Sequence, residues 1–320
     1  MKRTLVTAIS QLTEAHRAKI AAAASAHGFE ALFFEDERDA LDSLEDAEIA
    51  FGGSELLARR GLKLRWLCTP SAGVNQFTAP GTFTSPDAVL TNSSGAYGVT
   101  IAEHIVIVTL QIMRRQPEYA EMVRNRVWER GLAVRSVRDS RVTLLGTGDI
   151  GREAAIRLRS FSPACLVGVN RSGHNPASLF DRAAPESELD ALLPETDLLV
   201  VSLPGTPETF HMLDVRRLSL LPDGAIVVNV GRGSIIDQAA MLKELQSGRL
   251  SAALDVFETE PLPPDDPMWT CPNLVLTQHT AGNMTLPYTV NRIVSLFLED
   301  FENYCQGKPL KRQVNLEKGY

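Results

Sequence analysis

A strand, a glycine-rich turn and a helix follow one another near the middle of the chain and constrain its fold more than any other feature. The strand candidate at residues 141–145 runs directly into GTGDIG at residues 146–151, where a helical pattern begins. In such a unit the first glycine permits a tight turn, the second lets a pyrophosphate approach the backbone, and the third lets the helix pack closely on the strand. We therefore predict a dinucleotide site at the helix N-terminus. Its candidate cofactor-binding residues are Gly146, Thr147, Gly148, Asp149, Ile150 and Gly151.

The glycine turn belongs to the second of two series in which short apolar strands alternate with helical segments. The first series has strand candidates at residues 4–9, 31–34, 49–51 and 64–68, and the second has them at 142–145, 166–169, 198–203, 225–230, 252–257 and 274–277. Alternation of this kind predicts parallel sheets with crossover helices, and six strands complete a doubly wound sheet. A helix at about 99–115 joins the series, and a last helix near 288–304 is long enough to return to the first.

Two domains are expected, because 320 residues exceed what one hydrophobic core usually holds. The predicted fold class is α/β, with two Rossmann-like domains that each contain a doubly wound parallel sheet. Residues 1–97 plus 290–320 are expected to form one flavodoxin-like domain, and residues 98–289 the dinucleotide-binding Rossmann domain. The active site is expected in the cleft between them.

The charge balance and the cysteines exclude several classes of function. The chain has 39 acidic and 32 basic residues, a net charge of −7, and no basic stretch free of acidic neighbours, so nucleic-acid binding is disfavoured. Its four cysteines lie far apart, which predicts neither a zinc knuckle nor a disulfide framework and favours a cytoplasmic location. Neither a signal peptide nor a membrane span of ~20 apolar residues is expected.

The second strand of the Rossmann series predicts which nicotinamide cofactor is used. It ends in Asn170, Arg171 and Ser172, where an NAD-binding site usually presents a carboxylate to the adenosine ribose. Arg171 would instead pair with a 2′-phosphate, assisted by the Asn170 amide and the Ser172 hydroxyl, because a guanidinium matches the geometry of phosphate oxygens. We therefore expect NADP(H) to be preferred over NAD(H). The alternative is that Arg171 is only an exposed residue after a strand.

Three polar residues follow three successive strands of the second series: Arg232, Glu260 and His279. Because the carboxyl ends of parallel strands meet at one edge of a sheet, we expect them to lie together beside the nicotinamide. Arg232 would hold a substrate carboxylate, and His279 would give a proton to a carbonyl oxygen. Glu260 would favour the protonated imidazole. Taken singly, the arginine could be merely exposed and the histidine merely structural.

These residue types suit hydride transfer between the cofactor and a small 2-keto or 2-hydroxy acid. The cofactor supplies the hydride, so neither a metal nor a protein nucleophile is expected. Seven segments then show that the chain resembles the D-isomer-specific 2-hydroxyacid dehydrogenases. They are residues 69–74 (TPSAGV), 98–104, 146–151 (GTGDIG), 201–204 (VSLP), 229–237 (NVGRGSIID), 254–261 (LDVFETEP) and 276–282 (LTQHTAG).

The resemblance implies a role for each matching residue. Arg232 is implied as the substrate-binding arginine, Glu260 as the carboxylate partner and His279 as the acid/base, while the backbone amides of Ala72 and Gly73 are implied to hold the substrate carboxylate from the other, substrate-binding domain. The further cofactor contacts implied are Leu203, Pro204, Val230, Gly231, Asp255 and His279. The resemblance also implies a homodimer, and closure of the two domains on their ligands.

Residues 262–264 (LPP) and 267–269 (PMW) resemble the glyoxylate and hydroxypyruvate reductases within this family. Trp269 could line the substrate pocket, pack at a dimer contact or be a buried structural residue. Gln278 departs from the proline that many members have before the histidine. Two alternatives remain open: a phosphoglycerate dehydrogenase, and a nicotinamide-sensing binding protein like the family's corepressors. Glu260 argues against a formate dehydrogenase, which would have an amide there.

Overall fold

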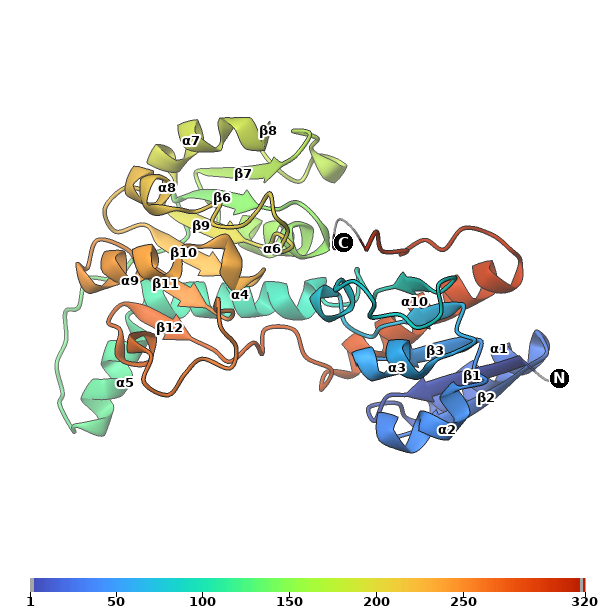
Figure 1. Cartoon of the computed structure of the whole chain (residues 1–320). Helices are drawn as coiled ribbons and strands as arrows, with labels where there is room; N and C mark the ends of the chain where they lie inside the picture. Colours follow the sequence, from blue (N-terminus) through green and yellow to red (C-terminus); the bar gives the residue numbers. More distant parts are fainter. Residues whose placement is uncertain (1–2, 317–318, 320) are drawn as a thin grey trace. The chain divides into compact units, whose positions relative to one another are not determined.

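The computed structural model describes residues 3–316 and 319, and its contacts divide the chain into two compact units. Unit 1 comprises Met1–Tyr97 and Asn283–Tyr320, and unit 2 comprises Gly98–Gly282 (Figure 1). Residues 283–289, which we expected in the second domain, therefore make their contacts within unit 1. In the described part of the chain, no helix is both long enough and apolar enough to span a membrane.

Unit 1 is built on a parallel five-stranded sheet in the order β2-β1-β3-β4-β5. Its strands are β1 (Arg3–Ala8), β2 (Phe29–Phe34), β3 (Ile49–Gly52), β4 (Trp66–Cys68) and β5 (Val89–Thr91). Its helices are α1 (Glu14–Ala26), α2 (Leu41–Leu44), α3 (Glu55–Arg60) and α10 (Pro287–Cys305). We did not predict β5, because three residues are too few to show an apolar periodicity.

Helix α10 joins the end of the chain to this sheet through buried aromatic rings. Phe297 stacks on Phe51 with ring centroids 4.1 Å apart and on Trp66 at 5.3 Å, and Phe301 meets Phe29 edge-on at 5.4 Å. Burying one side chain of this size contributes ~1.5–3 kcal/mol. The last helix therefore returns to the first domain, as predicted, because its aromatic side chains are buried against the sheet of that domain.

Unit 2 is a parallel seven-stranded sheet in the order β12-β11-β10-β9-β6-β7-β8. Its strands are β6 (Arg141–Leu145), β7 (Cys165–Asn170), β8 (Arg182–Pro185), β9 (Leu198–Val201), β10 (Ile226–Asn229), β11 (Ser251–Leu254) and β12 (Leu274–Leu276). Its helices are α4 (Gly98–Met113), α5 (Gln116–Arg124), α6 (Asp149–Arg159), α7 (Leu189–Leu192), α8 (Val215–Leu220) and α9 (Gln238–Gln246).

The sheet of unit 2 has one strand more than the six that we predicted. The additional strand, β8, lies at the sheet edge and has the sequence RAAP, which lacks the β-branched and aromatic residues that mark strands. The strand order reverses between β6 and β9, because β7 and β8 lie on one side of β6 and β10 to β12 continue beyond β9. Ligands of doubly wound sheets bind outside the carboxyl ends of strands at such a reversal.

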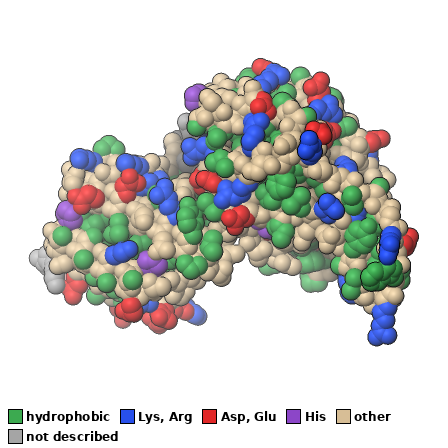
Figure 2. All heavy atoms as spheres, turned by 180° about the vertical axis from the view of Figure 1, so that it is seen from behind, with side chains coloured by type: hydrophobic (Ala, Val, Ile, Leu, Met, Phe, Trp, Pro, Cys, Tyr) green, Lys and Arg blue, Asp and Glu red, His purple; other side chains and the backbone are tan. Residues whose placement is uncertain are grey.

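Helix α4 lies along unit 2, where it packs on α6 and against β10, β11 and β12 (Figure 1). The buried residues of α4 include Ile101, Ile105 and Val108, which recur at helical spacing as predicted. On the face of the molecule drawn in Figure 2, acidic and basic side chains are interspersed. The phosphate backbone of a nucleic acid would therefore meet charges of both signs on that face.

Candidate active site

The turn between β6 and α6 uses each of its three glycines for a different physical reason. Gly146 has a left-handed φ of 110°. A Cβ on Gly151 would lie 2.0 Å from the Gly146 carbonyl oxygen, so the helix approaches this closely only without a side chain. A Cβ on Gly148 would meet nothing within 4 Å, so the space beside it is open. The turn thus has the form that a pyrophosphate requires, with a helix N-terminus behind it.

The polar side chains of this turn are engaged with neighbouring segments. Asp149 accepts a hydrogen bond of 2.8 Å from the backbone amide of Gly98, the first residue of α4. Thr147 accepts from the Asn170 amide at 2.8 Å. What the turn offers to an anion is therefore its backbone N–H groups, including those of Gly148 and Ile150, rather than its side chains.

Asn170 builds the turn after β7. Its Nδ2 donates to Thr147 Oγ1 and to the His174 carbonyl, each at 2.8 Å, and its Oδ1 accepts from the Ser172 amide at 3.0 Å and from the Ser172 hydroxyl at 3.2 Å. Our expectation that the Asn170 amide assists a phosphate contact does not fit these bonds, because its amide donors already have partners. Arg171 and Ser172 are exposed on this turn.

The loops after β9 and β10 touch each other beside the glycine turn. A Cβ on Gly231 would lie 2.6 Å from the Leu203 carbonyl oxygen. The Gly231 amide donates to Asn229 Oδ1 at 3.0 Å, and Asn229 Nδ2 donates to the Arg232 carbonyl at 2.9 Å. The carbonyl of Pro204 accepts from the Thr209 hydroxyl at 2.7 Å. Of the predicted cofactor contacts, Leu203 and Pro204 thus follow β9 at the strand-order reversal, and Val230 and Gly231 follow the neighbouring strand β10.

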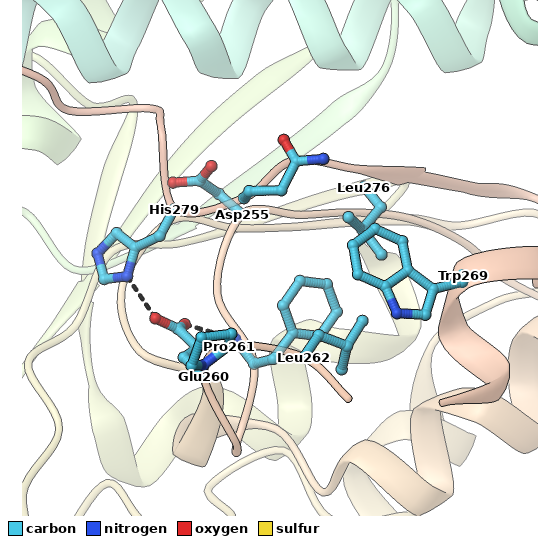
Figure 3. A pocket seen from close by; sticks show the side chains of 9 residues that line it. Asp255, Glu260, Pro261, Leu262, Trp269, Leu276 and His279 are labelled. Atoms are coloured by element: carbon cyan, nitrogen blue, oxygen red, sulfur yellow. Dashed lines mark hydrogen bonds and ion pairs between the residues drawn. The ribbon is translucent and has the colours of Figure 1, made fainter. Parts of the chain in front are cut away.

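His279 and Glu260 form a hydrogen-bonded pair. The distance between His279 Nδ1 and Glu260 Oε2 is 2.6 Å, and the two side chains point toward one another (Figure 3). Glu260 Oε1 accepts from the Phe257 amide at 2.9 Å, which fixes the carboxylate. The side chains are 49% and 33% exposed, so the pair is open to a ligand. An imidazole held by a carboxylate in this way has one nitrogen oriented and the other left for a substrate.

Asp255 holds the turn that carries His279, a structural role that our sequence reasoning missed. It is 3% exposed, and its carboxylate accepts from the Thr277 hydroxyl at 2.6 Å and from the amides of Thr280 and Ala281 at 2.8 and 3.0 Å. Its carbonyl accepts from the His279 amide at 2.8 Å. We had predicted Asp255 only as a cofactor contact. No sequence spacing signals this role, because the bonds join separate strand ends.

Arg232 follows β10 at the same end of the sheet. Its Nη1 donates to the Gly231 carbonyl at 2.7 Å. Burial lowers the pKa of the Arg232 guanidinium, and the negative charge of Glu260 opposes that shift, so the two side chains interact electrostatically. Arg232, Glu260 and His279 thus follow the carboxyl ends of three neighbouring parallel strands, β10, β11 and β12, and Glu260 and His279 are hydrogen-bonded to one another.

A pocket of about 440 Å³ adjoins the histidine–glutamate pair within unit 2 (Figure 3). Its lining residues are Asp255, Phe257, Glu260, Pro261, Leu262, Trp269, Leu276, Gln278 and His279. Trp269 is 43% exposed, which rules out the interpretation of a buried structural residue, and its indole nitrogen donates to the Pro263 carbonyl at 2.8 Å. Gln278 is exposed at the wall of this pocket.

Ala72 and Gly73 lie in unit 1, in the loop after β4. The Ser71 carbonyl accepts from the Ser93 amide at 2.9 Å, and the Ala72 carbonyl accepts from Asn92 Nδ2 at 2.9 Å. In a trans peptide the N–H points opposite to the C=O. The N–H groups of Ala72 and Gly73 therefore point away from these partners, which is the orientation that a loop binding a carboxylate needs.

Comparison with known proteins decides the family. Residues 106–281 match the family model described as D-isomer specific 2-hydroxyacid dehydrogenase, NAD binding domain. The chain belongs to the D-isomer specific 2-hydroxyacid dehydrogenases. The family resemblance and the fold class expected from the sequence are thereby confirmed, as is an NAD(P)-dependent dehydrogenase acting on hydroxy acids.

Relatives of this D-2-hydroxyacid dehydrogenase cover most of its length. Glyoxylate/hydroxypyruvate reductase B of Serratia proteamaculans is 32% identical over 263 residues, which are 79% of this chain and 80% of the relative. A family protein from Aeromonas salmonicida has a solved structure with a TM-score of 0.87 and 30% identity, covering 99% of this chain and all of the other (100%). The NADPH-dependent glyoxylate/hydroxypyruvate reductase of Sinorhizobium meliloti, solved with NADP and sulfate, has a TM-score of 0.83 and 25% identity, with 100% of each chain covered.

Proposed function

We propose that this dehydrogenase reduces small 2-keto acids of the glyoxylate and hydroxypyruvate type, with NADPH as its preferred cofactor. The observation that carries the proposal is the 2.6 Å hydrogen bond between His279 and Glu260, with Arg232 at the neighbouring strand end. The names of the Serratia and Sinorhizobium relatives support the substrate class.

Each of the three residues has a distinct task in this reaction. The Arg232 guanidinium binds the substrate carboxylate through two parallel hydrogen bonds. His279 presents Nε2 to the keto oxygen, because its Nδ1 faces Glu260. During reduction the imidazolium gives its proton to that oxygen, and during oxidation the imidazole takes the proton back. The carboxylate of Glu260 stabilises the imidazolium and fixes the ring.

The glycine turn of unit 2 fits a dinucleotide. The open space beside Gly148 and the N-terminus of α6 suit a pyrophosphate, and the backbone amides of this turn would hold it. When bound, the nicotinamide cofactor supplies the hydride. In the substrate-binding role proposed for unit 1, the amides of Ala72 and Gly73 bind a substrate carboxylate.

The preference for NADPH rests on the turn after β7. Its exposed residues include Arg171 and Ser172, and no carboxylate stands at this strand end to bind a ribose 2′-hydroxyl. A guanidinium with a neighbouring hydroxyl suits a 2′-phosphate. The Sinorhizobium relative, whose structure contains NADP, is consistent with this assignment.

A substrate panel measured with both cofactors tests the proposed function. We expect oxidation of NADPH with glyoxylate and hydroxypyruvate, and a higher kcat/KM with NADPH than with NADH. Arg171→Ala should lower the NADPH to NADH ratio by about 10- to 150-fold, since a charge-assisted hydrogen bond contributes ~1.5–3 kcal/mol. No turnover with any 2-keto acid would contradict the reductase assignment and favour a nicotinamide-sensing binding protein, whereas a clear NADH preference would contradict the cofactor assignment alone.

A cytoplasmic homodimer is part of the proposal. In the described chain, Cys68, Cys165, Cys271 and Cys305 are free thiols, as is usual in a reducing compartment. The segment around the end of α5 exposes large apolar side chains: Val123 is 76% exposed, Val127 49%, Trp128 88% and Val134 45%. Several large apolar side chains exposed along one segment are typical of a surface that another protein covers.

A further inference from the structure

A second imidazole–carboxylate pair lies beside the first. Glu258 follows β11, two positions before Glu260, and its Oε1 lies 2.9 Å from Nε2 of His211. His211 comes from the segment between β9 and α8. The two glutamates of one short loop thus hold two histidines, His279 on one side and His211 on the other.

Glu258 also binds the segment that carries Arg232. The same Oε1 accepts from the Gln238 amide at 2.9 Å, and the Glu258 amide donates to Gln238 Oε1 at 3.1 Å. Gln238 is the first residue of α9, shortly after Arg232 in the chain. The loop with the dyad carboxylate and the loop with the arginine are therefore joined by a reciprocal pair of hydrogen bonds.

The loop of Arg232 packs between two backbones. On one side, the His211 amide donates to the Ser234 carbonyl at 2.8 Å. On the other side, a Cβ on Gly233 would lie 1.9 Å from the carbonyl carbon of Phe257 and 2.4 Å from the amide nitrogen of Glu258. The residue next to Arg232 thus lies in direct contact with the peptide between Phe257 and Glu258.

The His211–Glu258 pair contributes little to stability. The two side chains are 32% and 36% exposed, and ion pairs with this degree of exposure contribute at most ~1 kcal/mol. His211 nevertheless has a left-handed backbone with φ 47°, as His279 does with φ 55°. The hydrogen bonds of His211 to Glu258 and Ser234 therefore serve to join the two loops rather than to stabilise the fold.

We propose that His211 and Glu258 form a positioning pair that sets the spacing between Arg232 and the Glu260–His279 dyad. The proposal rests on the function proposed above and assigns two further residues to it. Neither residue touches the substrate. His211 holds Glu258 in place, and Glu258 holds the start of α9 and, through Gly233, the loop of Arg232.

Kinetics of His211→Ala test the pair. We expect kcat for the keto acid to fall about tenfold, because misplacing a catalytic group by ~1 Å costs up to ~10²-fold in rate. KM for the keto acid should rise as well, because Arg232 binds its carboxylate, whereas the Kd of NADPH should change by less than about twofold, since the cofactor is held by the glycine turn and the residues after β7. His211→Gln should restore most of kcat, since its Nε2 can donate to Glu258 in place of the imidazole.

His27→Ala is the matched control. His27 pairs with Glu302 at 2.8 Å, with side chains 29% and 51% exposed, and lies in unit 1. It should leave kcat at the wild-type value, and neither alanine variant should lower Tm by more than about 2 °C, because both pairs are exposed. A wild-type kcat in His211→Ala, or an equal loss in His27→Ala, would overturn the proposal.

A crystal structure of His211→Ala separates this inference from the proposed function. We expect Arg232 and Gln238 to shift relative to Glu260 by ~1 Å, the displacement that would account for the rate loss. An unchanged arrangement would refute the positioning role even if the variant had lost activity. Conversely, inactivity of the wild-type enzyme toward all 2-keto acids would refute the proposed function, while the spacing measured in the crystal would still decide the inference.

Discussion

His279 shows how far residue-level reasoning from the sequence reaches. Its chemistry was predictable from its place after a strand of the second series and from the motif around it. Its left-handed φ of 55° was not, because that conformation depends on Asp255, which binds the amide of His279 and three further donors of the same turn. Tertiary hydrogen bonds between separate strand ends leave no periodic signal in a sequence.

The first prediction concerns His279 as the acid/base. In His279→Ala we expect kcat to fall by ~10² to 10⁴-fold, because the keto oxygen loses its proton donor. The Kd of NADPH should stay nearly constant, since backbone amides of the glycine turn and the residues after β7 hold the cofactor in our proposal. Steady-state kinetics and fluorescence titration measure the two quantities. Turnover at the wild-type rate would exclude this residue as the acid/base.

At the scale of elements, the long helices and the central strands were predictable, and the short edge strands were not. Helix α6 begins within the glycine motif, where the sequence predicts the start of a helical pattern. Strands β5 and β8 have too few residues and too weak a composition to be recognised. Whether such a segment forms a strand depends on its pairing with a neighbouring strand, which the local sequence does not show.

Two glycines of one turn give a matched pair of variants. A methyl group at Gly151 would lie 2.0 Å from a backbone oxygen, so Gly151→Ala should displace α6 and lower Tm by several degrees. A methyl group at Gly148 meets open space, so Gly148→Ala should fold with nearly the wild-type Tm and yet weaken NADPH binding about tenfold or more, because it occupies the approach of the pyrophosphate. Thermal melts and cofactor titrations compare them. Equal Tm values for the two variants would contradict this assignment of the glycines.

Helix α4 contributes a histidine whose titration links pH to stability. Burial lowers the pKa of His104, against the opposing charge of Asp255. Its Nε2 lies 3.4 Å from Thr277 Oγ1, whose proton goes to Asp255, because a carboxylate only accepts. The neutral imidazole therefore carries its hydrogen on Nε2 and donates it to Thr277.

The sign of the pH dependence follows from that lowered pKa. His104 binds a proton less readily in the folded state than in the unfolded state. The neutral side chain therefore makes its full contribution to folding stability above the ordinary pKa of ~6.5, and that contribution is lost as the pH falls toward the folded pKa. Urea unfolding of the wild type and of His104→Gln, at pH 8 and pH 5.5, should show a larger acid loss in the wild type. Identical losses would contradict the assignment, since glutamine keeps the donor but does not titrate.

At the scale of the whole molecule, the two-unit organisation was suggested by length and by the two strand series. Each unit has its own parallel sheet and its own core. The second crossing between units falls after Gly282, only a few residues beyond His279, rather than at the expected residue 290. Glycine and proline often mark a domain boundary, but residues 282–287 contain one of each. The sequence alone therefore does not show at which residue of this stretch the chain crosses between units.

Oligomeric state tests the exposed apolar segment after α5. We expect light scattering after size-exclusion chromatography to report twice the mass of 35.0 kDa. Trp128→Glu should shift the mass toward that of one chain, because it places a charge within an apolar surface covered by a second chain. Leu62→Glu, at a residue of unit 1 that is 55% exposed, is a control outside this segment. A wild-type mass of 35.0 kDa would refute the homodimer.

The contact at Gly233 has a consequence for redesign. Because a hydrogen atom is all that fits between this residue and the backbone of Phe257 and Glu258, the arginine loop and the glutamate loop behave as a single block. Libraries that diversify either loop alone should yield mostly misfolded or inactive clones. Engineering of substrate scope would do better to vary the pocket wall at Leu262 and Trp269, or to graft both loops together from one donor enzyme.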